Sequence, residues 1–253
     1  MVRTRVIPCL QLINESLVKT VKFKSHSYIG DPVNTVRIFN ELEVDELCFL
    51  DIRATLENRP PNFKILAEIA DECFMPLAYG GGVKDAETAR QILSIGFEKI
   101  VLNTAAMKNP DLISKIASHS GNQSVIGSID VKKSIWGGYH VYTHDGTKRT
   151  DVDPIEYARK LENLGVGELL ITSIDRDGTW SGFEIDIIKS IAAAVTVPVI
   201  ANGGAGNLKH IGEVVKEANA SAVALGSMVV YQKKGLGVLV NFPDQAELKR
   251  IIG

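Results

Sequence analysis

The chain has 253 residues and a composition typical of soluble globular proteins, with 45% hydrophobic and 23% charged residues. Its net charge of -2 gives no overall field that favours nucleic acid or an anionic membrane, and no apolar run reaches the roughly 20 residues of a membrane span. The N-terminal stretch "MVRTRVIPCL" lacks the apolar segment of a signal peptide, so we expect a cytoplasmic protein.

Apolar runs that resemble buried strands alternate with amphipathic helical stretches along the whole chain. Helical spacing is clear at 86–95 and 184–194, and continuous apolar strands between helices indicate a parallel sheet covered by helices. Eight such units in about 250 residues predict an α/β fold, a (β/α)₈ TIM barrel, as one domain over 1–253. A doubly wound open sheet is the alternative. The eight predicted strands are 5–11, 46–52, 75–79, 99–103, 124–130, 168–174, 197–201 and 222–226.

The two halves of the chain resemble each other. Residues 30–47, "GDPVNTVRIFNELEVDEL", align with residues 152–169, "VDPIEYARKLENLGVGEL", at an offset of 122. Chance similarity between apolar runs explains one such match, but hardly several in the same order. We therefore expect two fused, duplicated half-barrels, at about 1–120 and 121–253.

The first strand ends with an unexpected polar residue. An offset of 119 aligns "IPCLQL" (7–12) with "IGSIDV" (126–131), so Gln11 corresponds to Asp130. Both are predicted at the C-terminal ends of strands, on opposite sides of the barrel mouth, where enzymes of this fold carry their active sites.

A long loop is expected at 13–31, after the first strand. It carries Lys19, and we interpret it as a lid that brings a lysine to a phosphate, with plain solvated lysines as the alternative. Asp51 ends the second strand and is a candidate for ligand contact.

Glycine-rich turns follow two strands that correspond in the repeat. Gly81 and Gly82 lie in "PLAYGGGVK" (76–84), and Gly203 and Gly204 lie in "PVIANGGAG" (198–206). Such turns let a backbone approach a ligand, and the following helix N-terminus favours an anion. Small polar residues end the next strand in each half: Asn103 and Thr104, Gly226 and Ser227. A purely conformational role is the alternative, but two copies favour an elongated ligand with a phosphate at each end.

Two further segments are predicted at the mouth. "TSIDRDGT" (172–179) places Thr172, Asp177 and Gly178 at the end of a strand, where the alternative is a simple Asp-Gly surface turn. β-prone residues around Asp145-Gly146 in 139–150 predict a hairpin that forms a flap.

Charged residues begin four of the strands. Arg5, Glu46, Lys99 and Glu168 are predicted around the barrel floor, where two acids and two bases could form a closed salt-bridge ring. Scattered surface ions are the alternative. Cys9, Cys48 and Cys73 lie in apolar runs without metal-ligand spacing, which predicts reduced core thiols, no metal site and no cofactor.

Together, "RVIPCL", "FLDI", "NTAAMKNPDLI", "VYTHDGTKRT", "TSIDRDGT" and "PVIANGGAG" strongly resemble the cyclase subunit of imidazole glycerol phosphate synthase, nearly end to end. The resemblance implies a barrel that takes ammonia from a separate glutaminase docked at its floor. The ammonia then reaches a bisphosphorylated ribonucleotide at the mouth, which is cleaved and cyclised in histidine biosynthesis.

The resemblance also assigns roles to residues. Arg5, Glu46, Lys99 and Glu168 match an ammonia gate, Lys19 matches a mobile-loop lysine, and Asp130 matches one of two catalytic aspartates. One phosphate site matches Gly82, Asn103 and Thr104, and the other matches Asp177, Gly178, Gly203, Gly204, Gly226 and Ser227. The second catalytic aspartate falls on Gln11, and a carboxamide does not exchange protons as a carboxylate does.

This departure leaves three hypotheses. The sequence also resembles a divergent branch of the family, associated with amidation of surface-polysaccharide sugars, in which the barrel relays ammonia to a third, sugar-amidinating protein. The second hypothesis is a working cyclase. The third is a non-catalytic module that binds phosphate ligands and activates its glutaminase.

Overall fold

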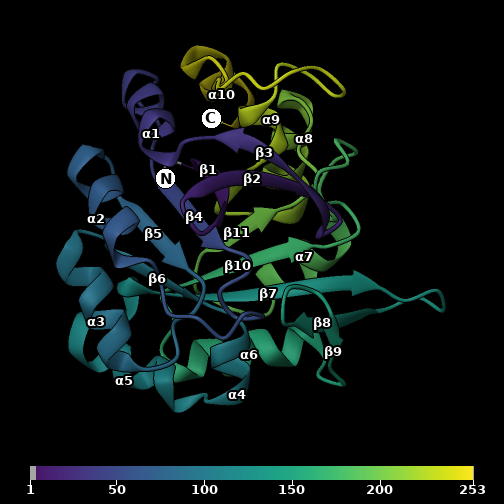
Figure 1. Cartoon of the computed structure of the whole chain (residues 1–253). Coiled ribbons are helices and arrows are strands. Elements are labelled where there is room, and N and C mark those ends of the chain that lie inside the picture. The colour runs from purple at the N-terminus through teal and green to yellow at the C-terminus, as the bar shows by residue number, and fades with distance from the viewer. Residues whose placement is uncertain (1–3, 253) are drawn as a thin grey trace.

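The computed structural model describes residues 4–252, in which eight parallel strands close into a barrel (Figure 1). Closure is shown by the pairing of β12 with β1 and of β7 with β10. The predicted (β/α)₈ barrel is confirmed, and the open sheet is excluded. The barrel strands are β1 (Arg5–Ile13), β4 (Leu47–Asp51), β5 (Leu77–Gly80), β6 (Lys99–Leu102), β7 (Val125–Lys133), β10 (Glu168–Ser173), β11 (Val199–Asn202) and β12 (Ala222–Leu225).

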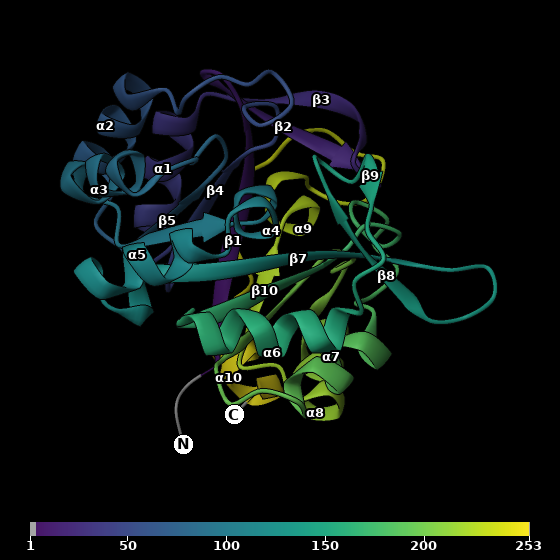
Figure 2. The same ribbon diagram turned by 90° about the horizontal axis from the view of Figure 1, so that it is seen from below.

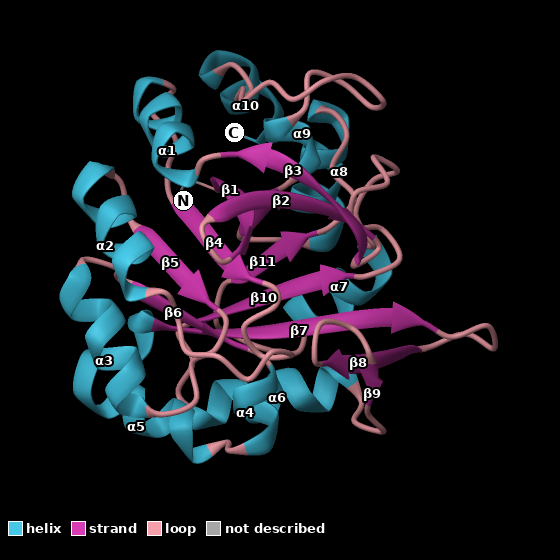
Figure 3. Cartoon of the chain, in the orientation of Figure 1, coloured by secondary structure: helices cyan, strands magenta, loops and turns pink. Residues whose placement is uncertain are grey.

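Helices surround this barrel (Figure 3). The stretch predicted at 86–95 is α3, and the one at 184–194 is the slightly shorter α7. Local signals explain where helices start: Asp31 accepts a hydrogen bond from the N–H of Asn34, and a proline occupies the first turn of α1. The helices are α1 (Pro32–Glu41), α2 (Phe63–Glu72), α3 (Ala86–Ile95), α4 (Thr104–Lys108), α5 (Asp111–Ser120), η1 (Asn122–Ser124), α6 (Pro154–Leu164), α7 (Ile185–Ala192), α8 (Leu208–Ala218), α9 (Ser227–Val230) and α10 (Gln245–Ile252).

The sequence repeat reappears in the elements. Helix α1 begins at Pro32 and α6 at Pro154, which are 122 residues apart, and Asp31 and Asp153 cap them in the same way. Strands β5 and β11 and helices α3 and α8 begin with the same separation. This agreement supports the interpretation of two related half-barrels.

Each half also carries a hairpin above its first barrel strand. Residues 13–31, expected as a loop, instead form β2 (Ser16–Val21) and β3 (Lys24–Gly30), with β2 antiparallel to β1. The hairpin predicted at 139–150 is confirmed as β8 (Tyr139–Thr143) and β9 (Lys148–Arg149), and β8 pairs with the extended end of β7. Figure 2 shows both hairpins on the same side of the barrel.

The buried apolar side chains form two compartments. A large one joins the outside of the barrel to the helices, and a small one fills the barrel interior with residues such as Ile7, Ala78, Val101 and Ala224. Cys9 and Cys48 belong to the interior and, like the half-buried Cys73, are free thiols as predicted. Within residues 4–252, no helix has the length and apolar character that crossing a membrane requires.

Candidate active site

The barrel floor carries the four predicted charges in one closed ring. Arg5 Nη1 lies 2.6 Å from Glu46 Oε2, and Arg5 Nη2 lies 2.8 Å from Glu168 Oε1. Lys99 Nζ donates to both oxygens of Glu46 at 2.9 Å and to Glu168 Oε1 at 3.3 Å. Burial lowers the pKa of Arg5, but the charges of Glu168 and Glu46 raise it above its ordinary value. The ring is therefore present, and scattered surface ions are excluded.

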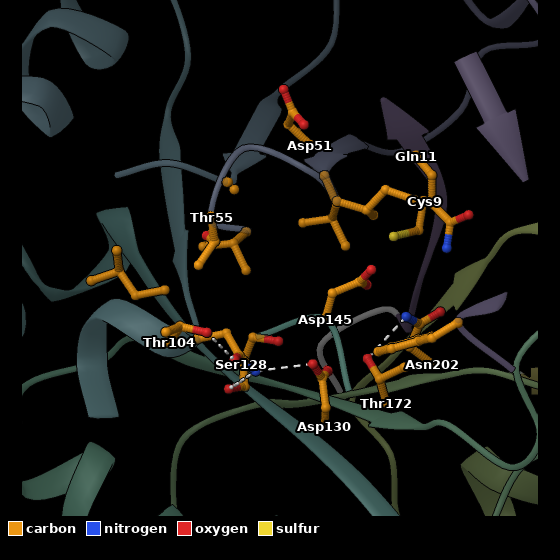
Figure 4. A pocket seen from close by; sticks show the side chains of 18 of the residues that line it. Cys9, Gln11, Asp51, Thr55, Thr104, Ser128, Asp130, Asp145, Thr172 and Asn202 are labelled. Atoms are coloured by element: carbon orange, nitrogen blue, oxygen red, sulfur yellow. Dashed lines mark hydrogen bonds between the residues drawn. The ribbon is translucent and has the colours of Figure 1, made fainter. Parts of the chain in front are cut away.

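The opposite end of the barrel contains a cavity that opens to solvent (Figure 4). Its lining comes from the C-terminal ends of the barrel strands and from both hairpins. It collects most of the predicted mouth residues: Gln11, Lys19, Asp51, Gly81, Gly82, Asn103, Thr104, Asp130, Thr172, Asp177 and Gly226.

The first predicted phosphate site lies on one side of this cavity. Gly81 has a φ of 117°, and a Cβ at this position would collide with the backbone carbonyl of Asp51, so the turn requires glycine. Thr104 Oγ1 accepts a hydrogen bond from the N–H of His144 at 2.9 Å, which ties this site to the β8–β9 hairpin.

The second predicted phosphate site is a small separate hollow. It is lined by Asp177, Gly178, Gly203, Gly204, Gly226 and Ser227, which the sequence had grouped together. The predicted contact of an anion with the N-termini of α3 and α8 stays a prediction. At these ends the side chains of Asp85 and Asn207 already accept from the N–H groups of Thr88 and His210.

Lys19 does not lie on an open loop. Its ammonium is buried, 2.8 Å from Asp177 Oδ1, and Thr20 Oγ1 donates to the other oxygen of Asp177 at 2.9 Å. The alternative of a plain solvated lysine is excluded at this position. The two contacts fasten the β2–β3 hairpin to the turn after β10.

Asp51 has a structural role that the sequence did not suggest. Both of its oxygens accept hydrogen bonds from Arg59, at 2.7 and 2.8 Å, and Oδ1 also accepts from the N–H groups of Arg53 and Ala54. In Figure 4 its carboxylate points away from the cavity. Asp51 therefore holds the loop after β4 and is not a free ligand-binding group.

Asp130 is the buried acid of the cavity. Its pKa is raised to about 8, first by burial and then by the nearby charges of Asp145 and Asp177, while a hydrogen bond with Thr172 opposes the shift. Asn103 Nδ2 donates to Asp130 Oδ2 at 3.1 Å. A carboxyl group with this pKa can gain and lose a proton near neutral pH, as acid–base chemistry requires.

Gln11 lines the same cavity but is engaged elsewhere. Its Oε1 accepts a hydrogen bond from the N–H of Thr20 at 2.9 Å. The amide therefore joins β1 to the β2–β3 hairpin, which explains why a polar residue ends this apolar run.

Several cavity residues were not singled out from the sequence. Asn202 donates to Thr172 Oγ1 at 3.1 Å, and Ser128 lines the wall beside Asp130. Asp145 also lines the cavity. Its pKa is raised to about 7, first by burial and also by the charge of Asp177, while Arg53 opposes the shift. The repeat could have indicated Asn202, because Asn202 is the last residue of β11 and corresponds to Gly80, the last residue of β5. Asp145 was interpreted only as part of a turn.

This fold and site define an enzyme-type (β/α)₈ barrel, with buried acids and glycine-rich turns at the C-terminal ends of its strands. A family model described as "Histidine biosynthesis protein" matches residues 5–235. The chain belongs to this family and is a HisF-like synthase subunit.

Three relatives carry closely related names. A putative imidazole glycerol phosphate synthase subunit hisF2 of Pseudomonas aeruginosa is 50% identical over 248 residues, covering 98% of this chain and 99% of the relative. A putative HisF subunit of Leptospira borgpetersenii is 46% identical over 245 residues, covering 96% of each. A putative hisF3 subunit of Vibrio vulnificus is 42% identical over 253 residues, covering 100% and 97%.

Proposed function

We propose that this chain receives ammonia from a separate glutaminase docked at the barrel floor and passes it through the interior to the mouth. The observation that carries the proposal is the closed ring of Arg5, Glu46, Lys99 and Glu168. In this proposal the paired charges exclude bulk ions, and the movement of one side chain opens the ring to a small neutral molecule. The interior above the ring is apolar and includes the small side chains Ala78, Ala222 and Ala224, which suits passage of ammonia better than ammonium.

The partner is proposed as a separate chain because this barrel has no candidate glutaminase centre in its described part. Cys9 and Cys48 are buried in the barrel interior, where glutamine has no access. Phe74, which precedes β5 and so lies at the floor end of the barrel, is 86% exposed. An exposed aromatic side chain at this end supports docking of a protein there.

For the acceptor of the ammonia, we propose a surface-polysaccharide sugar that a third protein amidinates. Gln11 supports this relay, because it occupies the position of an acid in the family that the sequence resembles, and its amide oxygen is already bonded to Thr20. In this role the barrel needs no proton-exchanging group of its own at position 11.

A second candidate is the cyclase reaction on a bisphosphorylated ribonucleotide. It is favoured by one observation: the first predicted phosphate site shares a cavity with the buried acid Asp130, whose pKa of about 8 suits proton exchange. The second predicted site shares Asp177, Asn202 and Gly226 with this cavity. The two candidates differ in where the nitrogen of glutamine ends.

The delivery step is tested with Lys99→Ala in the complex with the glutaminase. Loss of Lys99 leaves Glu46 and Glu168 without one of their two shared cations, so we expect glutamine-dependent transfer to change while the reaction with added ammonium salts keeps its rate. Lys64→Ala removes an exposed lysine from α2 and should change neither reaction. An equal loss in both reactions for Lys99→Ala would contradict a gate.

The acceptor is tested with glutamine labelled with ¹⁵N at the amide. Label in a sugar, formed only when the third protein is present, supports the relay. Label in an imidazole product, formed without a third protein, supports the cyclase reaction. Glutaminase activation without transfer of label to either product would support the regulatory hypothesis.

A further inference from the structure

The turn between β8 and β9 places the carboxyl group of Asp145 in the lining of the mouth cavity. Asp145 has a φ of 56° and is followed by Gly146 with a φ of 68°. A Cβ at Gly146 would lie 2.9 Å from Phe23 Cδ2, so this turn packs directly against the tip of the β2–β3 hairpin. The two hairpins thus meet over the cavity and hold Asp145 at its roof.

Asp145 differs from the other acids of the mouth in its partners. Asp51 is bonded to Arg59, and Asp177 is bonded to Lys19. Among the residues that the structure describes, Asp145 has neither a hydrogen bond nor a salt bridge, and Figure 4 shows its carboxylate pointing into the cavity between Asp130 and Gln11. It is therefore available to a ligand.

The charged groups around Asp145 come from several elements. They are Asp130 on β7, Asp177 after β10, Arg53 after β4, Lys19 on β2 and the neighbouring His144. Arg53 is exposed to solvent and bonded to Glu57, and Lys19 is bonded to Asp177, so neither cation forms a pair with Asp145. Burial is the first cause of the raised pKa of Asp145 and also of Asp130. The charge of Asp145 is one cause of the raised pKa of Asp130, so the protonation of one carboxyl affects the other.

We propose that Asp145 is the second proton-exchanging carboxyl of the mouth and works opposite Asp130, in the role that the carboxamide of Gln11 cannot fill. The inference rests on the proposed delivery of ammonia to the mouth and gives the cyclase candidate its missing acid. The second acid thus comes from the β8–β9 turn, while Gln11 on β1 anchors the β2–β3 hairpin.

The pair fits the addition of ammonia to a carbonyl carbon. The nitrogen lone pair forms the C–N bond, and the C=O π electrons move to oxygen, which takes the proton of Asp130. The carboxylate of Asp145, the less basic of the two, takes a proton from the new ammonium group. The product is a neutral carbinolamine, and the pair still holds one proton, now on Asp145.

The first test is a pH titration of the full-length chain, labelled with ¹³C at the aspartate carboxyl groups, by NMR. We expect Asp145 to titrate near pH 7. Asp145→Asn should remove this titration and lower the titration point of Asp130, because a negative neighbour is lost. Asparagine tolerates a positive φ, so the variant should keep the turn. Titration of Asp145 near pH 4, its ordinary range, would overturn the proposal.

The second test is turnover of the bisphosphorylated ribonucleotide with added ammonium salts. Asp145→Asn should lower kcat by about 10²- to 10⁴-fold with little change in KM, and the pH profile should lose its rise near pH 7. Asp151→Asn, which changes an exposed aspartate beyond β9, is the matched control and should behave as wild type.

The two tests separate the inference from the function on which it rests. A wild-type rate in Asp145→Asn, together with a large loss in Asp130→Asn, would overturn the role of Asp145 and leave the cyclase candidate standing. If the wild-type chain does not turn over the ribonucleotide, the cyclase candidate fails, and the NMR titration alone decides whether Asp145 exchanges a proton near neutral pH.

Discussion

The two ends of the barrel use charge in opposite ways. At the floor, two acids and two bases contact one another in a closed ring. At the mouth, four aspartates surround one cavity, but within residues 4–252 only Asp51 and Asp177 have cationic partners. Asp130 and Asp145 have none, and the pKa of each is raised to near neutral.

This difference separates two functions of buried charge. A charged group that contacts several opposite charges stays ionised and holds its geometry, which suits a seal. A buried carboxyl without a cation changes its protonation state near neutral pH, which suits chemistry. We therefore expect the stability of the floor to depend on its ion pairs, and the protonation of the mouth to depend on carboxyl groups without a cationic partner.

The largest loss of stability is expected at the floor, from Glu46→Ala. Glu46 is buried and contacts both Arg5 and Lys99, so its removal leaves two cations partly buried with one acid between them. We expect the free energy of unfolding to fall by about 3–5 kcal/mol, measured by chemical denaturation. Glu46→Gln, which keeps the volume and one acceptor, should lose less.

The control for this prediction is Glu68→Ala on α2. Glu68 is about half exposed, and its oxygen lies 3.9 Å from Lys64, so the unfolding midpoint should not move measurably. A loss as small for Glu46→Ala as for Glu68→Ala would mean that the floor charges are solvated and that pairing does not hold the ring.

The second effect concerns the mouth and depends on pH. An aspartate in the unfolded chain has a pKa of about 3.9, whereas the pKa of Asp130 in the fold is about 8. Between these values the folded state holds a proton that the unfolded state has released, so Asp130 lowers stability progressively as pH rises through this window.

Asp130→Asn tests this linkage, because asparagine resembles the protonated acid and still accepts from Asn103. The variant should match wild type near pH 4 and be more stable by roughly 5 kcal/mol near pH 9, because the two pKa values differ by about 4 and each unit corresponds to about 1.4 kcal/mol. The measurement is the free energy of unfolding across this pH range. A stability difference that does not change with pH would show that Asp130 is ionised throughout.

The sequence predicted the barrel and the floor ring well, because both follow from short-range patterns. Apolar runs of four or five residues, glycine turns and capping residues define each unit locally, as at Asp31 and Pro32. The floor charges each occupy the first residue of a strand or the residue before it, so closure of the barrel is sufficient to bring them together.

The roof of the mouth was harder to predict, because its contacts join distant segments. Lys19 is buried only because Asp177, 158 residues away, is its partner. An Asp-Gly turn signal is also the same whether the aspartate faces solvent or a cavity, and the orientation of Asp145 depends on the packing of Gly146 against Phe23. Neither relation is visible in local spacing.

The smallest effect is expected at Gln11, which lines the mouth cavity but has a structural role there. Thr20 is buried, and its N–H donates to the amide oxygen of Gln11. Gln11→Met keeps the volume but leaves this N–H without an acceptor, so we expect a loss of about 1–2 kcal/mol in the free energy of unfolding. Gln11→Glu keeps an acceptor and should lose less, which isolates the hydrogen bond from packing. If Gln11→Met instead abolished ammonia-dependent turnover at unchanged stability, the amide itself would take part in the chemistry, and the division between a hairpin anchor at β1 and an acid pair at Asp130 and Asp145 would be wrong.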